Sequence, residues 1–142
     1  MSKAFLIAAM LLAGATAQAQ TAPSAPAKPA AAETPEQLVQ RQVDAYNAGS
    51  AARFVATYAE NAELLDFPSK PQLTGRTKLT EFYNKFFTWA PHVHCDVVSR
   101  TVLGNKIIDH ERVTGLPNGK TVDAVAIYEV ENGLIRRVTF IE

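Results

Sequence analysis

The sequence predicts an α+β domain in which three amphipathic helices pack on a strongly curved, largely antiparallel sheet. Apolar residues recur with helical spacing in three segments between residues 34 and 87. Beyond Pro91, four segments alternate between apolar and polar residues, and turn sequences such as Asn132-Gly133 separate them. Consecutive strands joined by tight turns form an antiparallel meander, so we expect the helices to bury their apolar stripes on its concave face.

Each predicted helix has a recognisable start or an apolar stripe. The first, over residues 34–47, opens with the capping-box sequence Thr34-Pro35-Glu36-Gln37. The second begins after Ser50, and Phe54 and Tyr58, four residues apart, are expected to share its buried face. The third runs from about 76 to 87, with apolar residues spaced three and four apart.

The predicted strands follow from alternation and from turn residues. Gly104-Asn105, Pro117-Asn118-Gly119 and Asn132-Gly133 are typical of hairpin turns. The expected strands cover residues 62–67, 92–102, 106–115, 120–130 and 134–141.

The N-terminus is typical of a secretory signal peptide. Lys3 precedes an uncharged apolar run, and Ala17-Gln18-Ala19 fits a small-x-small cleavage site. We expect cleavage after Ala19, a periplasmic or secreted location, and no membrane contact afterwards, the alternative being an uncleaved anchor. Residues 20–33, rich in Pro and Ala, are expected to be a disordered linker, and residues 34–142 a single domain.

Charge and metal-ligand chemistry exclude several classes of function. The whole chain has a net charge of 0, and residues 1–19 hold one lysine and no acid. With no long basic run, nucleic-acid binding is excluded. The single cysteine, Cys95, is expected to be buried and inert. His92 and His94 are expected to point outward without a further ligand, so we expect neither a metal ion nor a cofactor.

Three stretches together resemble a known superfamily. They are VQRQVDAYNAGSAARFVATYAENAELLDFP, TGRTKLTEFYNKFF and GKTVDAVAIYEVENGLIRRVTF. Their order and spacing resemble the nuclear transport factor two-like superfamily, which includes SnoaL-like polyketide cyclases and ketosteroid isomerases. The resemblance implies a cone-shaped fold over nearly all of residues 34–142, and a homodimer formed through the outer face of the sheet.

The spacing also allows ketosteroid-isomerase site residues to be carried over. Asp66, nine residues before Gly75, falls where that family keeps its general base. Tyr83 matches a pocket tyrosine, and Gln42 stands in place of an oxyanion-binding tyrosine. Ile127 replaces a protonated aspartic acid, and isoleucine cannot donate a hydrogen bond. Since a lost oxyanion donor typically costs about 10²–10³ in rate, steroid isomerase activity is not expected.

The same alignment predicts which side chains face the pocket. Ile108, His110, Arg112 and Thr114 are expected on the inner face of one strand, and Asp123, Val125 and Ile127 on that of the next. Arg112 and Asp123 would form an ion pair, either structural or clamping a ligand. The substrate-binding residues expected from this arrangement are Gln42, Tyr58, Tyr83, Arg112, Asp123 and Ile127. Such a pocket would suit a smaller, oxygenated or anionic ligand.

Two classes of function remain open. The first is an exported isomerase, cyclase or hydrolyase with a small-molecule pocket, in which Asp66 shuttles a proton and Gln42, Tyr83 or the second catalytic candidate His110 acts as donor. The second is a ligand-binding or association module without chemistry. The residues also permit structural roles, since Asp66 can cap a turn before Phe67-Pro68 and His110 can be a solvated strand residue. An epoxide-hydrolase arrangement of Asp66, Arg112 and Asp123 is a minor alternative, because the Arg-x-Asp strand motif is absent.

Overall fold

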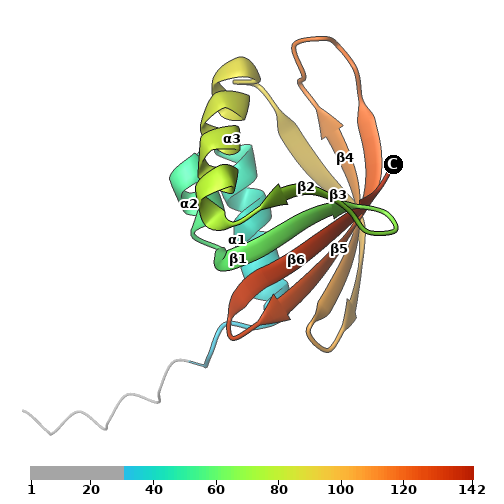
Figure 1. Ribbon diagram of the computed structural model, residues 1–142. Coiled ribbons are helices and arrows are strands. Elements are labelled where there is room, and N and C mark those ends of the chain that lie inside the picture. The colour runs from blue at the N-terminus through green and yellow to red at the C-terminus, as the bar shows by residue number, and fades with distance from the viewer. Residues whose placement is uncertain (1–30) are drawn as a thin grey trace, which may run out of the picture. The chain divides into compact units, whose positions relative to one another are not determined.

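Three helices pack against one face of a six-stranded sheet in the computed structural model, which describes residues 31–142 (Figure 1). The predicted α+β class is therefore confirmed. The predicted signal peptide, residues 1–19, and most of the predicted linker lie outside the described residues. Within residues 31–142, no helix is long and apolar enough to cross a membrane.

The helices begin where their capping residues predict. Helix α1, Pro35–Asn47, has both hydrogen bonds of the capping box, between Thr34 and Gln37. Helix α2, Ala51–Val55, is capped by the Ser50 hydroxyl, and α3 covers Arg76–Trp89. The prediction that Tyr58 lies on the second helix is wrong, because α2 ends earlier and Tyr58 opens the first strand.

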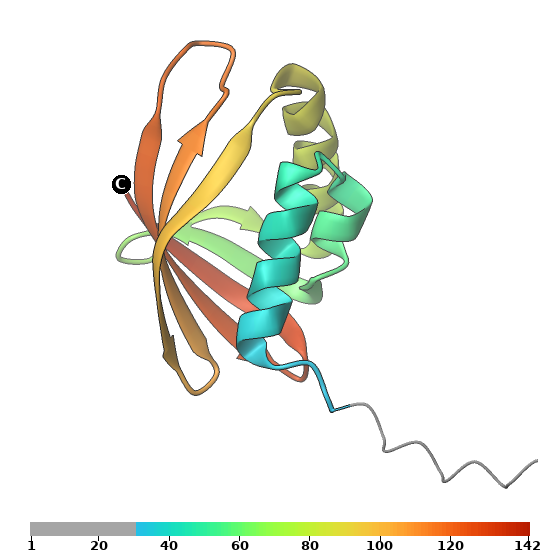
Figure 2. The ribbon, with the colours of Figure 1, turned by 180° about the vertical axis from the view of Figure 1, so that it is seen from behind.

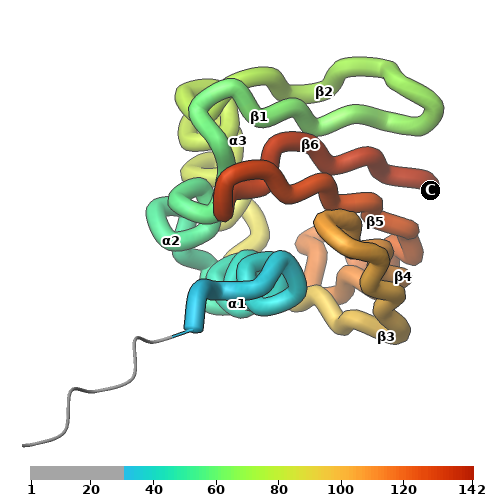
Figure 3. The backbone as a smooth tube through the Cα atoms, turned by 90° about the horizontal axis from the view of Figure 1, so that it is seen from below, coloured from blue at the N-terminus to red at the C-terminus, as the bar shows by residue number. Residues whose placement is uncertain are grey.

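The sheet has the order β2-β1-β6-β5-β4-β3, and it bends around the helices as an arc (Figure 3). Only β1 and β6 pair in parallel. The sequence did not predict β2, an edge strand containing Pro71, since proline within a short polar run argues against a strand. The strand bounds are β1 Tyr58–Asp66, β2 Lys70–Thr74, β3 His94–Leu103, β4 Lys106–Thr114, β5 Val122–Glu131 and β6 Leu134–Ile141.

The predicted hairpin turn at Asn132-Gly133 is confirmed. Both residues have positive φ angles, 50° and 73°, and the turn joins the antiparallel strands β5 and β6. Two consecutive positive φ angles match the twist of a tight hairpin, which is why Asn-Gly is favoured there. This turn brings β6 back beside β5, where it can also pair with β1.

The predicted inward face of β4 and β5 is wrong by one residue. The structure buries Ile107, Asp109 and Glu111 on β4, and Ala124, Ala126, Tyr128 and Val130 on β5. Consequently Ile108, His110, Arg112, Thr114, Asp123, Val125 and Ile127 lie on the outer face. The buried side of β4 holds two acids, so β4 by itself has no clear apolar face; the small residues and the tyrosine of β5 mark the buried side of the pair.

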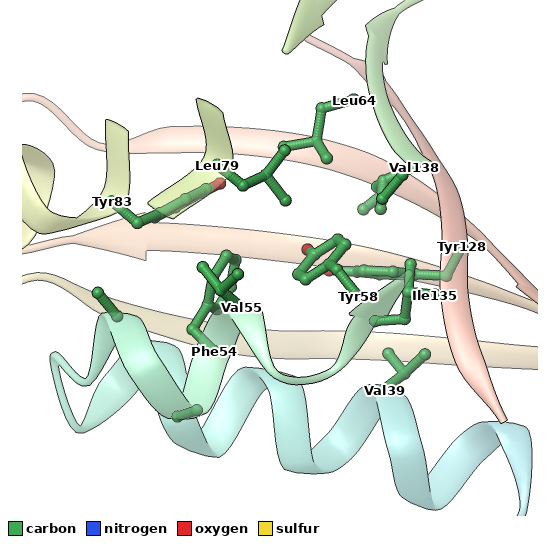
Figure 4. Close-up of a cluster of buried hydrophobic side chains, with 14 of the residues drawn as sticks. Val39, Phe54, Val55, Tyr58, Leu64, Leu79, Tyr83, Tyr128, Ile135 and Val138 are labelled. Atoms are coloured by element: carbon green, nitrogen blue, oxygen red, sulfur yellow. The ribbon is translucent and has the colours of Figure 1, made fainter. Parts of the chain in front are cut away.

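A cluster of aromatic and aliphatic side chains fills the space between helices and sheet (Figure 4). Phe54 of α2 is fully buried. The centroid of its ring lies 4.1 Å from that of the Tyr83 ring of α3 and 5.1 Å from that of the Tyr58 ring. Helix α1 lies against β3 and β4 at the other side of the helical layer (Figure 2). The predicted burial of Cys95 is confirmed.

A glycine after β4 should be indispensable for closing the sheet against the start of β3. Gly115 has φ +74°, and a Cβ there would lie 1.9 Å from the backbone oxygen of His92. Gly119 has a similar φ, +71°, but open space around it. We expect Gly119→Ala to lower the free energy of unfolding by about 1–2 kcal/mol through backbone strain alone, and Gly115→Ala to lower it clearly more. Urea denaturation measures both values. Equal losses would contradict the close approach of Gly115 to His92.

Candidate functional site

A pocket of about 120 Å³ lies between the helices and the inner face of the sheet. Its walls come from all three helices and from β3, β4, β5 and β6. The residues at one end, Val122 and Glu142, are partly or fully exposed, so the pocket opens to solvent there. The lining residues are Gln42, Val43, Tyr46, Phe54, Tyr83, Cys95, Glu111, Val113, Val122, Ala124, Tyr128, Phe140 and Glu142.

Glu111 is the buried acid of this pocket. Its position on the inner face of β4 leaves it 6% exposed, and the hydroxyl of Tyr128 donates a hydrogen bond of 2.6 Å to its Oε1. Burial raises the pKa of Glu111 to about 6, and the charge of Asp109 acts in the same direction, while the Tyr128 hydrogen bond and Arg100 oppose the rise. Glu111 can therefore exchange a proton near neutral pH.

The negative charge of the second buried acid, Asp109, is paired with a cation. Arg100 of β3 donates to both of its carboxylate oxygens, at 2.7 and 2.8 Å, and a third Arg100 nitrogen donates to Gln40 at 3.1 Å. Asp109 is 0% exposed, and this bidentate ion pair with Arg100 supplies the positive charge that a buried carboxylate requires. Arg100 is thus occupied and Asp109 does not line the pocket.

Two tyrosines bring hydroxyl groups to the same pocket. Tyr46 of α1 and Tyr83 of α3 line it, and neither hydroxyl forms a hydrogen bond with another described residue. Burial, assisted by the charge of Glu111, raises the pKa of both phenols above the usual range. Both side chains therefore stay protonated and can donate a hydrogen bond to a ligand.

Gln42 presents an unsatisfied carbonyl oxygen. Its Nε2 donates to the hydroxyl of Tyr58 at 3.1 Å, but its Oε1 has no partner among the described residues. The side chain is only 5% exposed and lines the pocket. A buried acceptor without a donor is costly, and a ligand or water that donates to it would remove that cost.

The predicted pocket positions of Gln42 and Tyr83 agree with the structure. Tyr58, also predicted to bind substrate, is fully buried behind Gln42 and does not line the pocket. Among the pocket residues that the sequence reasoning missed are Tyr46, Glu111 and Tyr128. For Glu111 and Tyr128 the signal was the run of small and aromatic residues Ala124, Ala126 and Tyr128 at every second position of β5, which marks its buried face.

Asp66, the predicted general base, lies elsewhere. It ends β1, accepts a hydrogen bond from Gln72, and lines a separate hollow beside Phe67 and Ile141. Only Phe140 and Glu142 border both this hollow and the main pocket. The structure therefore does not bring Asp66 together with Gln42 and Tyr83.

His110, Arg112 and Asp123 form a cluster on the outer face of the sheet. Arg112 and Asp123 are directly opposite on β4 and β5 and form the predicted ion pair, 2.9 Å long, while His110 Nε2 lies 3.3 Å from Asp123. The hydrogen bond from Arg112 lowers the pKa of Asp123. About half of the Arg112 side chain is exposed. The prediction that these residues and Ile127 face the pocket is wrong, because β4 and β5 bury the opposite face.

His92 and His94 were predicted to point away from the core. His94 is exposed and pairs with Asp96 at 3.2 Å, while Val93 and Cys95 between and beside them are buried. No group of three or more histidine, cysteine or acidic side chains within residues 31–142 is arranged to hold a metal ion.

Glu111→Gln should stabilise the protein at high pH. The pKa of Glu111 is about 6 in the folded state and about 4.5 in the unfolded chain, so folding loses stability as the pH rises through this interval. Glutamine keeps an oxygen for Tyr128 and removes the buried charge. We expect the variant to be more stable than wild type by about 2 kcal/mol at pH 8 and equally stable at pH 4. Urea denaturation at the two pH values measures this difference. The exposed control Glu131→Gln should show no such difference; a destabilised Glu111→Gln at pH 8 would contradict the burial of this charge.

The comparisons with known proteins agree with this architecture. An uncharacterised cystatin-fold protein from Novosphingobium aromaticivorans superposes with a TM-score of 0.72 at 21% identity, covering 77% of this chain and 98% of that one. A putative ketosteroid isomerase from Kribbella flavida has a TM-score of 0.64 at 23% identity, covering 77% of each chain. A putative SnoaL-like polyketide cyclase from Jannaschia sp. CCS1 has a TM-score of 0.62 at 17% identity, covering 75% of this chain and 83% of that one.

At these identities the structural likeness concerns the fold alone. No protein of curated function matches the sequence. The family model described as the SnoaL-like domain matches residues 39–138, which is most of the chain and includes the strands that carry Glu111 and Tyr128. The resemblance inferred from the sequence is confirmed, and the chain belongs to the SnoaL-like domain family.

Proposed function

We propose that the protein is an exported enzyme that moves a proton on a small molecule bound in the pocket, with Glu111 as proton acceptor and donor. The observation that carries the proposal is a buried carboxyl whose pKa is raised to about 6, inside a pocket that also holds two unbonded tyrosine hydroxyls. Export and a homodimer, inferred from the signal-peptide pattern and the family resemblance, are parts of the same proposal.

The chemistry that fits these groups is proton abstraction next to a carbonyl. The carboxylate of Glu111 takes the proton as the C–H bond breaks, and the electron pair moves onto the carbonyl oxygen. The hydroxyls of Tyr46 or Tyr83 donate hydrogen bonds to that oxygen as its negative charge develops. Glu111 then returns the proton to the same carbon or to another one, so that no further reactant is needed.

Pocket size supports a small substrate. About 120 Å³ is of the order of the space that holds a single-ring molecule in a protein core, and far below the roughly 300–1,000 Å³ of pockets for drug-sized ligands. A four-ring steroid exceeds this volume. The sequence argument reached the same conclusion, but its premise that Ile127 faces the pocket is contradicted by the structure.

Tyr128 supports the proposal as a positioning residue. It does not need to touch the substrate, because its hydroxyl donates to Glu111 Oε1 and leaves the second carboxylate oxygen to react. The same hydrogen bond favours the ionised form of Glu111 and limits the rise of its pKa. An enzyme with this base therefore gains both orientation and a usable fraction of carboxylate at neutral pH.

The proposed role of Glu111 can be tested with a one-ring ketone. We expect the wild-type protein to accelerate exchange of the α-protons of cyclohexanone with D₂O, measured by proton NMR at neutral pH. Glu111→Gln should lose at least about 10²-fold of this acceleration, whereas Asp66→Asn should retain it, because Asp66 lies outside the pocket. Loss of exchange in Asp66→Asn with retention in Glu111→Gln would return the catalytic role to Asp66. No acceleration by the wild type would favour the non-catalytic ligand-binding module.

The pH profile provides a separate test of the base. Because Glu111 must be ionised to accept a proton, the exchange rate should rise with pH, with a midpoint near 6, and level off above it. Tyr128→Phe removes a hydrogen bond that lowers the pKa of Glu111, so its midpoint should move upward. A midpoint near 4 that Tyr128→Phe leaves unchanged would show that a different, solvated carboxylate does the chemistry.

A further inference from the structure

The charges that line the pocket are all negative. Glu111 and Glu142 are its ionisable acids, and no lysine, arginine or histidine lines it. The nearby cation Arg100 is held by both oxygens of Asp109 and by Gln40, so it has no free edge for a ligand. An anionic ligand would therefore meet uncompensated like charge, whereas a cation would be attracted.

The unsatisfied polar atom of the pocket is a hydrogen-bond acceptor. Gln42 Oε1 is buried and has no partner among the described residues, while the amide nitrogen of this pocket-lining side chain donates to the Tyr58 hydroxyl. A ligand that donates an N–H there gains a hydrogen bond and removes a buried unpaired carbonyl at once. Gln42 therefore favours a ligand with a hydrogen-bond donor, in the same pocket in which Glu111 supplies negative charge.

Aromatic rings make up much of the remaining wall. Tyr46, Phe54, Tyr83 and Tyr128 all line the pocket, and the Phe54 ring lies 4.1 Å from the Tyr83 ring and 5.9 Å from the Tyr46 ring. The faces of such rings attract ammonium groups, and aromatic walls combined with acids are a recurring way to bind them.

We infer that the ligand of this pocket is a protonated amine of about one ring or smaller, whose ammonium group is held by Gln42 Oε1 and the surrounding aromatic rings and is attracted by the negative charge of Glu111. This inference rests on the proposed use of the pocket for a small molecule and names the chemical class of that molecule. It replaces the oxygenated or anionic ligand expected from the sequence, which depended on Arg112 and His110 facing inward.

The inferred ammonium is compatible with the proposed proton transfer. A positive charge within the substrate stabilises the negative charge that develops when Glu111 removes a proton from a neighbouring carbon. Gln42 in this arrangement is a specificity-determining residue, because it accepts from the ammonium and takes no part in moving the proton.

The inference is tested by calorimetric titration of wild-type protein with three compounds of the same ring size. The compounds are cyclohexylammonium, cyclohexanol and cyclohexanecarboxylate, at a pH where Glu111 is ionised. We expect the ammonium to bind about tenfold more tightly than the alcohol, and the carboxylate to bind most weakly. Equal binding of ammonium and alcohol, tighter binding of the carboxylate, or no binding of the ammonium would each overturn the inference.

Two variants locate the preference. Gln42→Met keeps the size of the side chain but removes the carbonyl, so the preference for ammonium over alcohol should fall about threefold or more. Gln72→Met makes the same change at an exposed position of β2, outside the pocket, and should leave the preference intact. An unchanged preference in Gln42→Met would overturn the role of Gln42, and the wild-type series tests the ligand class even if that variant is unstable. The cyclohexanone exchange assay reports separately on Glu111, so failure of one proposal does not imply failure of the other.

Discussion

The burial of one face of β4 is the constraint on which the candidate site depends. Strand β4 pairs with β5, and the large side chain of Tyr128 must enter the core together with Ala126. Because side chains alternate along a strand, this choice carries Asp109 and Glu111 inward and sends His110 to the outer face. Burying two carboxyl groups is costly, and the fold accepts that cost only because hydrophobic burial along β5 outweighs it.

The two buried acids have different partners, and this difference makes Glu111 the reactive group. Asp109 receives a full counter-charge from Arg100, through two short hydrogen bonds, and stays an inert part of the core. Glu111 has no ion-pair partner of its own and accepts from the neutral hydroxyl of Tyr128, so desolvation prevails and its pKa rises. Functional sites are often less stable than the surrounding core for this reason. The open end of the pocket gives a small molecule access to this carboxyl, and Gln42 supplies an acceptor in the same pocket.

Most of the architecture could be predicted because it rests on local signals. The capping box at Thr34 and the Asn132-Gly133 turn each determine their own backbone geometry, and the structure confirms both. The inward face of β4 could not be read from β4 itself, since a strand with Glu111 on one side and Arg112 on the other lacks a clear apolar face. Asp66 was assigned by its spacing from Gly75, which determines a position along the chain but not the direction in which a side chain points.

The central claim is that Glu111 is a buried carboxyl poised to exchange a proton near neutral pH. It is tested most directly by following the side-chain carboxyl carbon of Glu111 by NMR as the pH is changed, with Glu111→Gln used to assign the signal. A midpoint near 6 is the result expected from burial against Tyr128. A midpoint at the ordinary glutamate value of about 4.5 would show that the carboxyl is solvated, and would contradict both the pocket geometry and the proposed role of Glu111.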